Sequence, residues 1–160
     1  MKANLRPYRS GDATQVVELS LRAWEPVFKA LEAALGAEIF RRLHSDWRVD
    51  QRRAVEEVLA GEEMTVWVAD LGPSVAGFVA VRLHREAGLG EAHMLAVDPP
   101  YPNDGIGEQL TLLACDWIRD QGMGVAMVET GGDPGHAPAR RTYEKAGFSL
   151  VPVARYFKAL

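Results

Sequence analysis

The stretch Leu95–Trp117, which reads LAVDPPYPNDGIGEQLTLLACDW, determines how the rest of the chain is organised. Its second half has apolar residues spaced three and four apart, the pattern of a helix with one buried face: Ile106, Leu110, Leu113, Ala114, Trp117. Its first half carries Pro99, Pro100 and Pro102, and proline suits neither a central strand nor a helix interior. The stretch therefore predicts a strand that ends near Val97, a turn, and then a helix.

Two glycines, Gly105 and Gly107, fall in the first turn of this predicted helix, although glycine weakens helices. The first backbone N–H groups of a helix have no partners inside it, and the helix dipole favours negative charge there. The pattern therefore indicates that an anionic group of a ligand approaches the bare backbone. The structural alternative is a strand–turn–helix unit whose glycines serve only close packing.

Composition places the chain among ordinary globular proteins. Its 160 residues, 48% hydrophobic and 25% charged, suit a single domain over residues 1–160, with no apolar run long enough to span a membrane. The N-terminus shows no hydrophobic signal region and Cys115 is the sole cysteine, which together predict a cytoplasmic protein without disulfides. A net charge of −4 argues against nucleic acid as the main partner.

Periodicity predicts strands and helices along the whole chain. Strands are expected over 4–8, 64–70, 75–84, 89–97 and 125–129, with one or two more between Phe148 and Phe157. Helices are expected from residue 13 until Pro26 ends or bends the first one, and then over 31–43, 50–60, 106–120 and 138–146. Asp12 and Gln15 are spaced as a capping box for the first helix. This order predicts a mixed, mostly antiparallel α/β sheet with one central parallel pair.

Two motifs resemble those of a known superfamily. Val97, Pro99, Gly105, Ile106 and Gly107 resemble the acyl-CoA-binding motif of the GNAT superfamily of N-acetyltransferases. The stretch 136–148, HAPARRTYEKAGF, is similar to that family's Asn-x-x-Ala-x-x-x-Tyr-Glu-x-x-Gly-Phe motif, with histidine in the place of asparagine. The predicted element order agrees with this family over nearly the whole chain.

The resemblance implies a fold, a reaction and a co-substrate. The expected GNAT fold has helices on both faces of its sheet, and its central parallel pair splays to hold the cofactor. The expected enzyme moves an acetyl group from acetyl-CoA to a primary amine of a small molecule or peptide, by direct attack in a ternary complex. The residues implied in cofactor binding are Leu95, Ala96, Val97, Asn103, Asp104, Gly105, Ile106, Gly107, His136 and Arg140.

Three residues are candidates for moving protons. Glu91 lies fourteen residues before Gly105, the spacing of a glutamate base in histone-type members of the family, and His93 falls on the same strand face. Ordered water is the third candidate for the base. Tyr143 matches the family's general acid, which protonates the departing thiolate, and the alternative is an aromatic that only packs there.

The acceptor is expected near the first helices, at Trp24, Glu25 and Phe28. These residues do not distinguish a polyamine from an aminoglycoside, an amino acid or a protein N-terminus. The histidines lack the spacing of metal ligands, so no metal is expected. Homodimers are common in the family, and no feature of the sequence assigns an interface.

A second hypothesis comes from the departures from the family pattern. Pro102 occupies a position where the family carries glutamine or arginine, and Asp104 places a carboxylate near the expected pyrophosphate. The chain is then a non-catalytic acyl-CoA-binding or degenerate module with a sensing or interaction role. If Asp104 points outward as a helix cap, the repulsion disappears and the enzyme hypothesis stands.

Overall fold

The computed structural model describes residues 2–101 and 104–160. Its strands are β1 (Asn4–Pro7), β2 (Met64–Asp70), β3 (Val75–His84), β4 (Leu89–Val97) and β5 (Val125–Val128). Its helices are α1 (Ala13–Leu35), α2 (Ala37–Leu43), α3 (Trp47–Ala60), α4 (Ile106–Asp120) and α5 (Ala137–Lys145), with 3-10 turns η1 (Ser10–Asp12), η2 (Arg85–Ala87) and η3 (Pro134–His136). None of the helices in these ranges combines the length and hydropathy that a membrane crossing requires.

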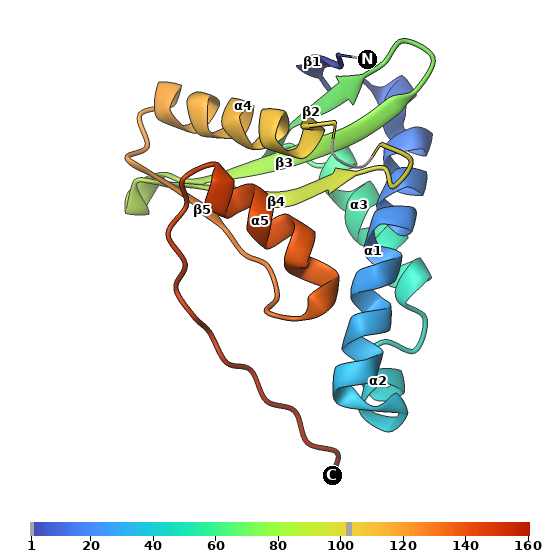
Figure 1. The fold of residues 1–160 in the computed structure, drawn as a ribbon. Coiled ribbons are helices and arrows are strands. Elements are labelled where there is room, and N and C mark those ends of the chain that lie inside the picture. Colours follow the sequence, from blue (N-terminus) through green and yellow to red (C-terminus); the bar gives the residue numbers. More distant parts are fainter. Residues whose placement is uncertain (1, 102–103) are drawn as a thin grey trace.

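The five strands form one sheet in the order β1-β2-β3-β4-β5 (Figure 1). Neighbouring strands are antiparallel except β4 and β5, which are parallel and joined through α4. The mixed α/β sheet with one parallel pair is therefore confirmed. The bounds predicted for β2, β3 and β4 are also confirmed. The runs of valine and aromatic residues in β2 and β3 are separated by the turn residues Gly72, Pro73 and Ser74.

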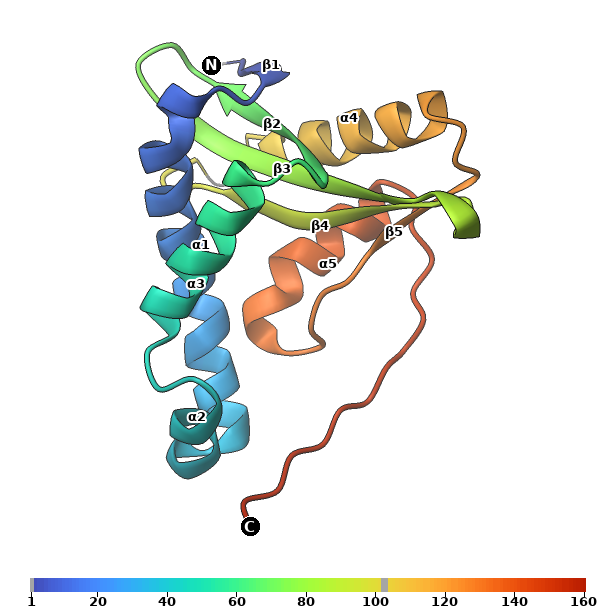
Figure 2. The same cartoon turned by 180° about the vertical axis from the view of Figure 1, so that it is seen from behind.

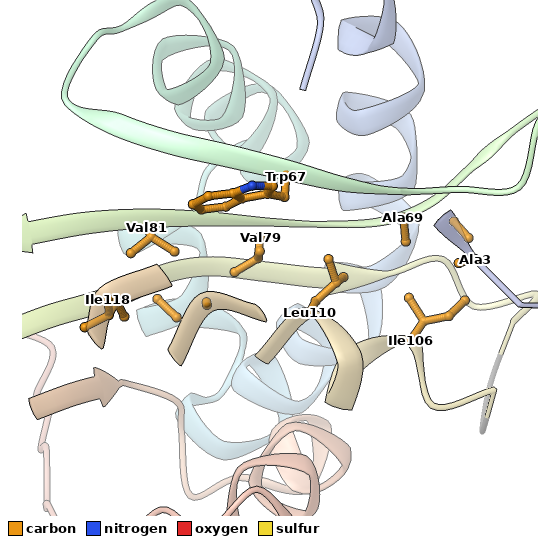
Figure 3. Packing of buried hydrophobic residues seen from close by; sticks show 11 residues of the cluster. Ala3, Trp67, Ala69, Val79, Val81, Ile106, Leu110 and Ile118 are labelled. Carbon is orange, nitrogen blue, oxygen red and sulfur yellow. The ribbon is translucent and has the colours of Figure 1, made fainter. Parts of the chain in front are cut away.

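Helices cover both faces of the sheet, as expected. On one face α4 buries Ile106, Leu110 and Ile118 against Trp67 and Val79 of the sheet (Figure 3). On the other face α1 and α3 lie side by side (Figure 2) and bury a second group of side chains, among them Val16, Leu19, Val55, Val68 and Phe78. Alternation along the strands supplies both layers, since Val66 and Val68 face one way and Trp67 and Ala69 the other.

The sequence predicts that Pro26 either ends or bends the first helix, and α1 does not end there. It continues to Leu35, and Gly36 ends it with a φ of 81°, in the left-handed region that favours glycine. Helix α3 begins at Trp47, three residues earlier than predicted, because the Asp46 side chain accepts a hydrogen bond from the backbone N–H of Val49.

The capping box predicted at Asp12 and Gln15 is wrong. The Asp12 carboxylate instead accepts two hydrogen bonds from the Arg6 guanidinium, at 2.8 and 2.9 Å. The Gln15 side-chain oxygen accepts a hydrogen bond from the backbone N–H of Val75, 2.8 Å away. Asp12 thus joins η1 to the nearby β1, whereas Gln15 joins α1 to the distant β3, and these partners compete successfully with the local cap.

The strands predicted between Phe148 and Phe157 are absent. This segment is extended chain outside the sheet, and it runs from the end of α5 toward α2 (Figure 1). Its apolar side chains are exposed, for example Val153 at 82% and Tyr156 at 91% of their surface. Strand propensity alone cannot supply the neighbouring strand that a ladder requires, and Pro152 has no N–H to donate.

Candidate active site

The N-terminus of α4 forms the glycine turn that the sequence indicated. Gly105 is the N-cap residue and has a φ of 72°, so its backbone conformation favours glycine. A Cβ atom added at Gly107 would lie 3.5 Å from Val97 Cγ2 and 3.7 Å from Thr142 Cγ2, which are ordinary contacts. Protein packing therefore does not force glycine at 107, and this turn is where β4, α4 and α5 meet.

The structure describes only some of the residues that precede this turn. Asp104 precedes Gly105 and is exposed to solvent. Asn103, expected in cofactor binding, and Pro102, the departure from the family pattern, lie outside the described residues. The first N–H groups of α4 lack acceptors within the helix and are the groups that an anion would use.

Strand β4 is only partly paired with β5. Their parallel ladder runs from Leu89 opposite Val125 to Ala92 opposite Val128. Beyond that point, in the described part of the chain, the β4 segment 93–97 has no neighbour on the β5 side. The splay that the resemblance implies is therefore present, and it leaves Leu95, Ala96 and Val97 without a strand partner on the β5 side.

The opening coincides with an irregularity on the other side of β4. Ala80 of β3 pairs with Met94, whereas Val81 pairs with Ala92, so His93 is an extra residue in β4. Such a bulge bends a strand and redirects its side chains. The bend begins where β5 stops following β4.

Tyr143 is a buried side chain on α5, with 9% of its surface exposed. Its ring packs edge-on against Phe148, with 5.9 Å between the ring centroids. Burial raises the pKa of the Tyr143 phenol, so the hydroxyl keeps its proton at neutral pH and above. The preceding residue, Thr142, is the one beside Gly107, so a protonated phenol lies on the turn of α5 that meets the glycine turn.

Glu91 lies between two histidines. Its carboxylate oxygens are 2.8 Å from His84 Nε2 and 3.5 Å from His93 Nδ1. Burial raises the pKa of Glu91, but the hydrogen bonds from both histidines outweigh this effect, and the net pKa lies below the ordinary value. The structure thus brings Glu91 and His93 together and adds His84. Within the described ranges, no three His, Cys, Asp or Glu side chains are placed to share a metal ion.

The other two cofactor candidates lie at the junction of the β5–α5 loop with α5, His136 at the end of the loop and Arg140 within the helix. His136 Nδ1 is hydrogen-bonded to the Asp133 carboxylate. Arg140 Nη1 donates to the carbonyl oxygens of Gly131 and Asp133, at 2.6 and 2.7 Å, and so braces the loop. The loop also packs against α1, since a Cβ atom at Gly135 would lie 2.8 Å from the Pro26 carbonyl oxygen.

The three acceptor candidates on α1 have partners within the protein. Trp24 packs against the core layer under α1. Phe28 stacks on Trp47 of α3, with 4.5 Å between ring centroids. Glu25 accepts a hydrogen bond from Arg48 Nη2 at 2.8 Å. The structure therefore places Glu25 and Phe28 in an aromatic and charged cluster between α1 and α3.

Sequence reasoning missed several residues that hold the site together. Arg22 of α1 donates two hydrogen bonds to Asp98, at 2.8 and 2.7 Å, and Asp98 is buried directly after β4. No local pattern predicts a pair that is 76 residues apart. Asp133, by contrast, precedes His136 by three residues, and that short spacing is a signal that could have suggested the pair.

Much of the chain is similar to a protein family and to named acetyltransferases. The family model described as the Acetyltransferase (GNAT) family matches residues 24–148. A mycothiol acetyltransferase of Rhodococcus erythropolis is 34% identical over 98 residues, which are 58% of this chain and 32% of that protein. One from Segniliparus rotundus is 32% identical over 117 residues, covering 66% of this chain and 43% of the relative. The chain thus spans about a third to two fifths of these relatives' length.

Solved structures share the fold. The N-acetyltransferase PaiA of Thermoplasma acidophilum, in complex with coenzyme A, superposes with a TM-score of 0.70 at 15% identity, covering 96% of this chain and 94% of that one. An aminoglycoside acetyltransferase from an uncultured soil sample, in complex with sisomicin, gives a TM-score of 0.64 at 15% identity, covering 98% and 95%. Because the family model spans most of the sequence, from α1 to the end of α5, the chain belongs to the Acetyltransferase (GNAT) family.

Proposed function

We propose that this member of the GNAT family is an acetyl-CoA-dependent N-acetyltransferase. Its acceptor is a primary amine of a small molecule or peptide, which attacks the thioester directly while both substrates are bound. The observation that carries this proposal is the segment 93–97 of β4, which has no strand partner on its β5 side and ends beside the glycine turn of α4. This arrangement offers backbone groups to an extended ligand at one end and N–H groups to an anion at the other.

The chain's own groups fit acetyl-CoA along this path. The N–H groups around Gly105, Ile106 and Gly107 would bind the pyrophosphate at the positive end of α4. The free backbone at Leu95–Val97 would pair with the pantetheine arm as an added strand does. One free N–H there would also stabilise negative charge on the thioester oxygen, an effect typically worth about 10²–10³ in rate. His136 and Arg140 would contact the cofactor from the α5 side.

Tyr143 is proposed as the general acid. Acetyl-CoA supplies the acetyl group as a thioester, whose thiolate leaves when the amine attacks. The Tyr143 phenol would give its proton to that thiolate. Burial supports this role, because it keeps the phenol protonated across the working pH range.

The base that accepts the amine proton has three candidates from the family pattern: Glu91, His93 and ordered water. Glu91 is a poor base in this environment, because hydrogen bonds from His84 and His93 lower its pKa despite burial. His93 is more exposed and lies at the bulge where the strands part. A water molecule bound near this pair would serve the same purpose.

The acceptor is proposed to enter on the α1 side, near Trp24, Glu25 and Phe28. Glu25 would attract a cationic amine, although Arg48 already pairs with it. Aminoglycosides suit a first search, because a structure of similar fold is in complex with sisomicin. Polyamines, amino acids and peptides with free N-termini complete the panel. The relatives named mycothiol acetyltransferases are nearly twice as long as this chain, so their substrate is one further acceptor to test.

Calorimetric titration with acetyl-CoA, with CoA in parallel, tests the proposal first. Micromolar binding supports a working phosphate site, and acetyl transfer to any amine of the panel would then establish the enzyme. No binding at millimolar acetyl-CoA would favour the alternative, a degenerate module with a sensing or interaction role.

An Asp104→Lys variant separates the two hypotheses further. A large gain in acetyl-CoA affinity would mean that the native carboxylate repels the pyrophosphate and weakens the site. Affinity that changes little would mean that Asp104 points away from the bound anion, as its exposure suggests. Asp116→Asn, an exposed change farther along α4, is the matched control.

A further inference from the structure

The loop between β5 and α5 has space for the Asp133 carboxylate because it carries glycine at two neighbouring positions. Its side chain is 12% exposed, and the side chain of His136, its partner, is 21% exposed. A Cβ atom at Gly131 would overlap Asp133 Oδ1 and lie 2.6 Å from His136 Nδ1. A Cβ atom at Gly135 would lie 3.0 Å from Asp133 Oδ2. Glycine at both positions leaves room for the carboxylate and for the imidazole that it holds.

Two further contacts hold this pair rigid. The backbone N–H of His136 donates to the Asp133 carbonyl at 3.1 Å, and Arg140 donates to the same carbonyl from α5. With Nδ1 donating to the carboxylate, a neutral imidazole has its lone pair on Nε2. Among the described residues, no group hydrogen-bonds to Nε2. The arrangement therefore presents one nitrogen of His136 as a free proton acceptor.

The position of His136 suits the acceptor amine. Its turn packs against α1 at Pro26 and Val27, the part of α1 that carries the acceptor candidates. His136 ends η3 directly before α5 begins, and Tyr143 lies in the second turn of that helix. A proton acceptor thus lies toward α1 and a proton donor toward the glycine turn.

From this geometry, and resting on the proposed function, we infer that His136, oriented by Asp133, is the base of the reaction. As the amine nitrogen bonds to the thioester carbon, His136 Nε2 takes one proton from that nitrogen. The carbon–sulfur bond breaks, and Tyr143 gives one proton to the sulfur. The imidazolium and the phenolate then exchange these protons with solvent, so the net products are the amide and CoA. Asp133 is a positioning residue that stabilises the imidazolium.

Charged groups on α1, α5, β3 and β4 are paired with other residues. On α1, Arg22 is bonded to Asp98, and Glu25 is paired with Arg48 and Lys29. On α5, Arg140 is bonded to loop carbonyls. On β3 and β4, His84 and His93 are occupied with Glu91. Asp133 is therefore the carboxylate that directly faces the His136 ring.

His136→Asn is the decisive variant, because asparagine is the residue that the family motif carries there. Asparagine can hydrogen-bond to a cofactor but cannot accept a proton. We expect kcat to fall by about 100-fold or more, as loss of a general base does, with acetyl-CoA affinity changed less than about two-fold. The acidic fall in kcat that a general base produces should disappear in this variant.

Asp133→Asn tests the positioning role. It should lower kcat in the same direction without changing acetyl-CoA affinity, and adding it to His136→Asn should cost little more. Asp116→Asn serves as the control for an exposed carboxylate. Melting temperature is measured for every variant, so that a fall in kcat through unfolding is separated from loss of the base.

The outcomes distinguish the inference from the function on which it rests. If His136→Asn keeps kcat and its pH profile, His136 only contacts the cofactor and the inference is overturned. It is also overturned if Glu91→Gln, and not His136→Asn, removes the acidic fall in kcat. If the native protein binds no acetyl-CoA and acetylates no amine, the proposed function fails and the inference fails with it.

Discussion

A single hydroxyl separates two roles for Tyr143. The ring packs against Phe148, whereas only the hydroxyl can supply a proton. Tyr143→Phe keeps the ring and removes the donor. We therefore expect kcat to fall by about 10²-fold, the lower range for loss of a general acid, while acetyl-CoA affinity and melting temperature stay nearly constant. Steady-state kinetics measures kcat, titration calorimetry measures the affinity for acetyl-CoA, and thermal unfolding gives the melting temperature. Unchanged turnover would remove Tyr143 from the mechanism.

Glu91 should make stability depend on pH. Burial acts to raise its pKa, but hydrogen bonds from His84 and His93 bring it below that of a glutamate in the unfolded chain. The stabilisation from its carboxylate is therefore complete above the unfolded pKa, about 4.3, and is lost as the pH falls through the lower folded value. Urea unfolding at a series of acidic pH values should show a flatter dependence in Glu91→Gln. Glu38→Gln, on the surface of α2, should match the native protein.

At the scale of elements, two different surfaces hold α1. Its apolar side packs on the sheet, while Arg22 ties it to the end of β4 through a nearly buried Asp98. The carboxylate comes directly after the strand that is proposed to bind the pantetheine arm. The ion pair of Arg22 with Asp98 therefore links the proposed acceptor side to the proposed cofactor side.

Arg22→Ala should destabilise the protein, because it leaves the buried Asp98 carboxylate without its partner. Breaking such a pair typically costs about 3–5 kcal/mol, and the 50% exposure of the Arg22 side chain places the expected loss at or below about 3 kcal/mol. Arg52→Ala removes a bond of the same 2.8 Å length to Glu18, where both side chains are more than 40% exposed. That control should cost much less, because water and salt screen an ion pair between exposed side chains. Equal losses in urea unfolding would contradict the special role of Asp98.

For the whole molecule, stability should come from the two layers of apolar side chains on the sheet. Leu110 is fully buried between α4 and the sheet (Figure 3), whereas Val153 in the C-terminal segment is 82% exposed. Leu110→Ala should cost about 2–5 kcal/mol. Val153→Ser should change the free energy of unfolding by less than about 0.5 kcal/mol. A large effect at Val153 would show that the segment 148–160 packs against another surface in solution.

The sequence by itself determined most of the elements and the family. Runs of valine and aromatic residues predicted β2 and β3, helical spacing predicted α4, and the glycine and tyrosine motifs identified the GNAT family, because each signal lies within a few consecutive residues. The bulge at His93, the pairs of Arg22 with Asp98 and of His84 with Glu91, and the path of the segment after α5 came only from the tertiary structure. These features depend on which distant segments become neighbours, and local propensity carries no information about such contacts.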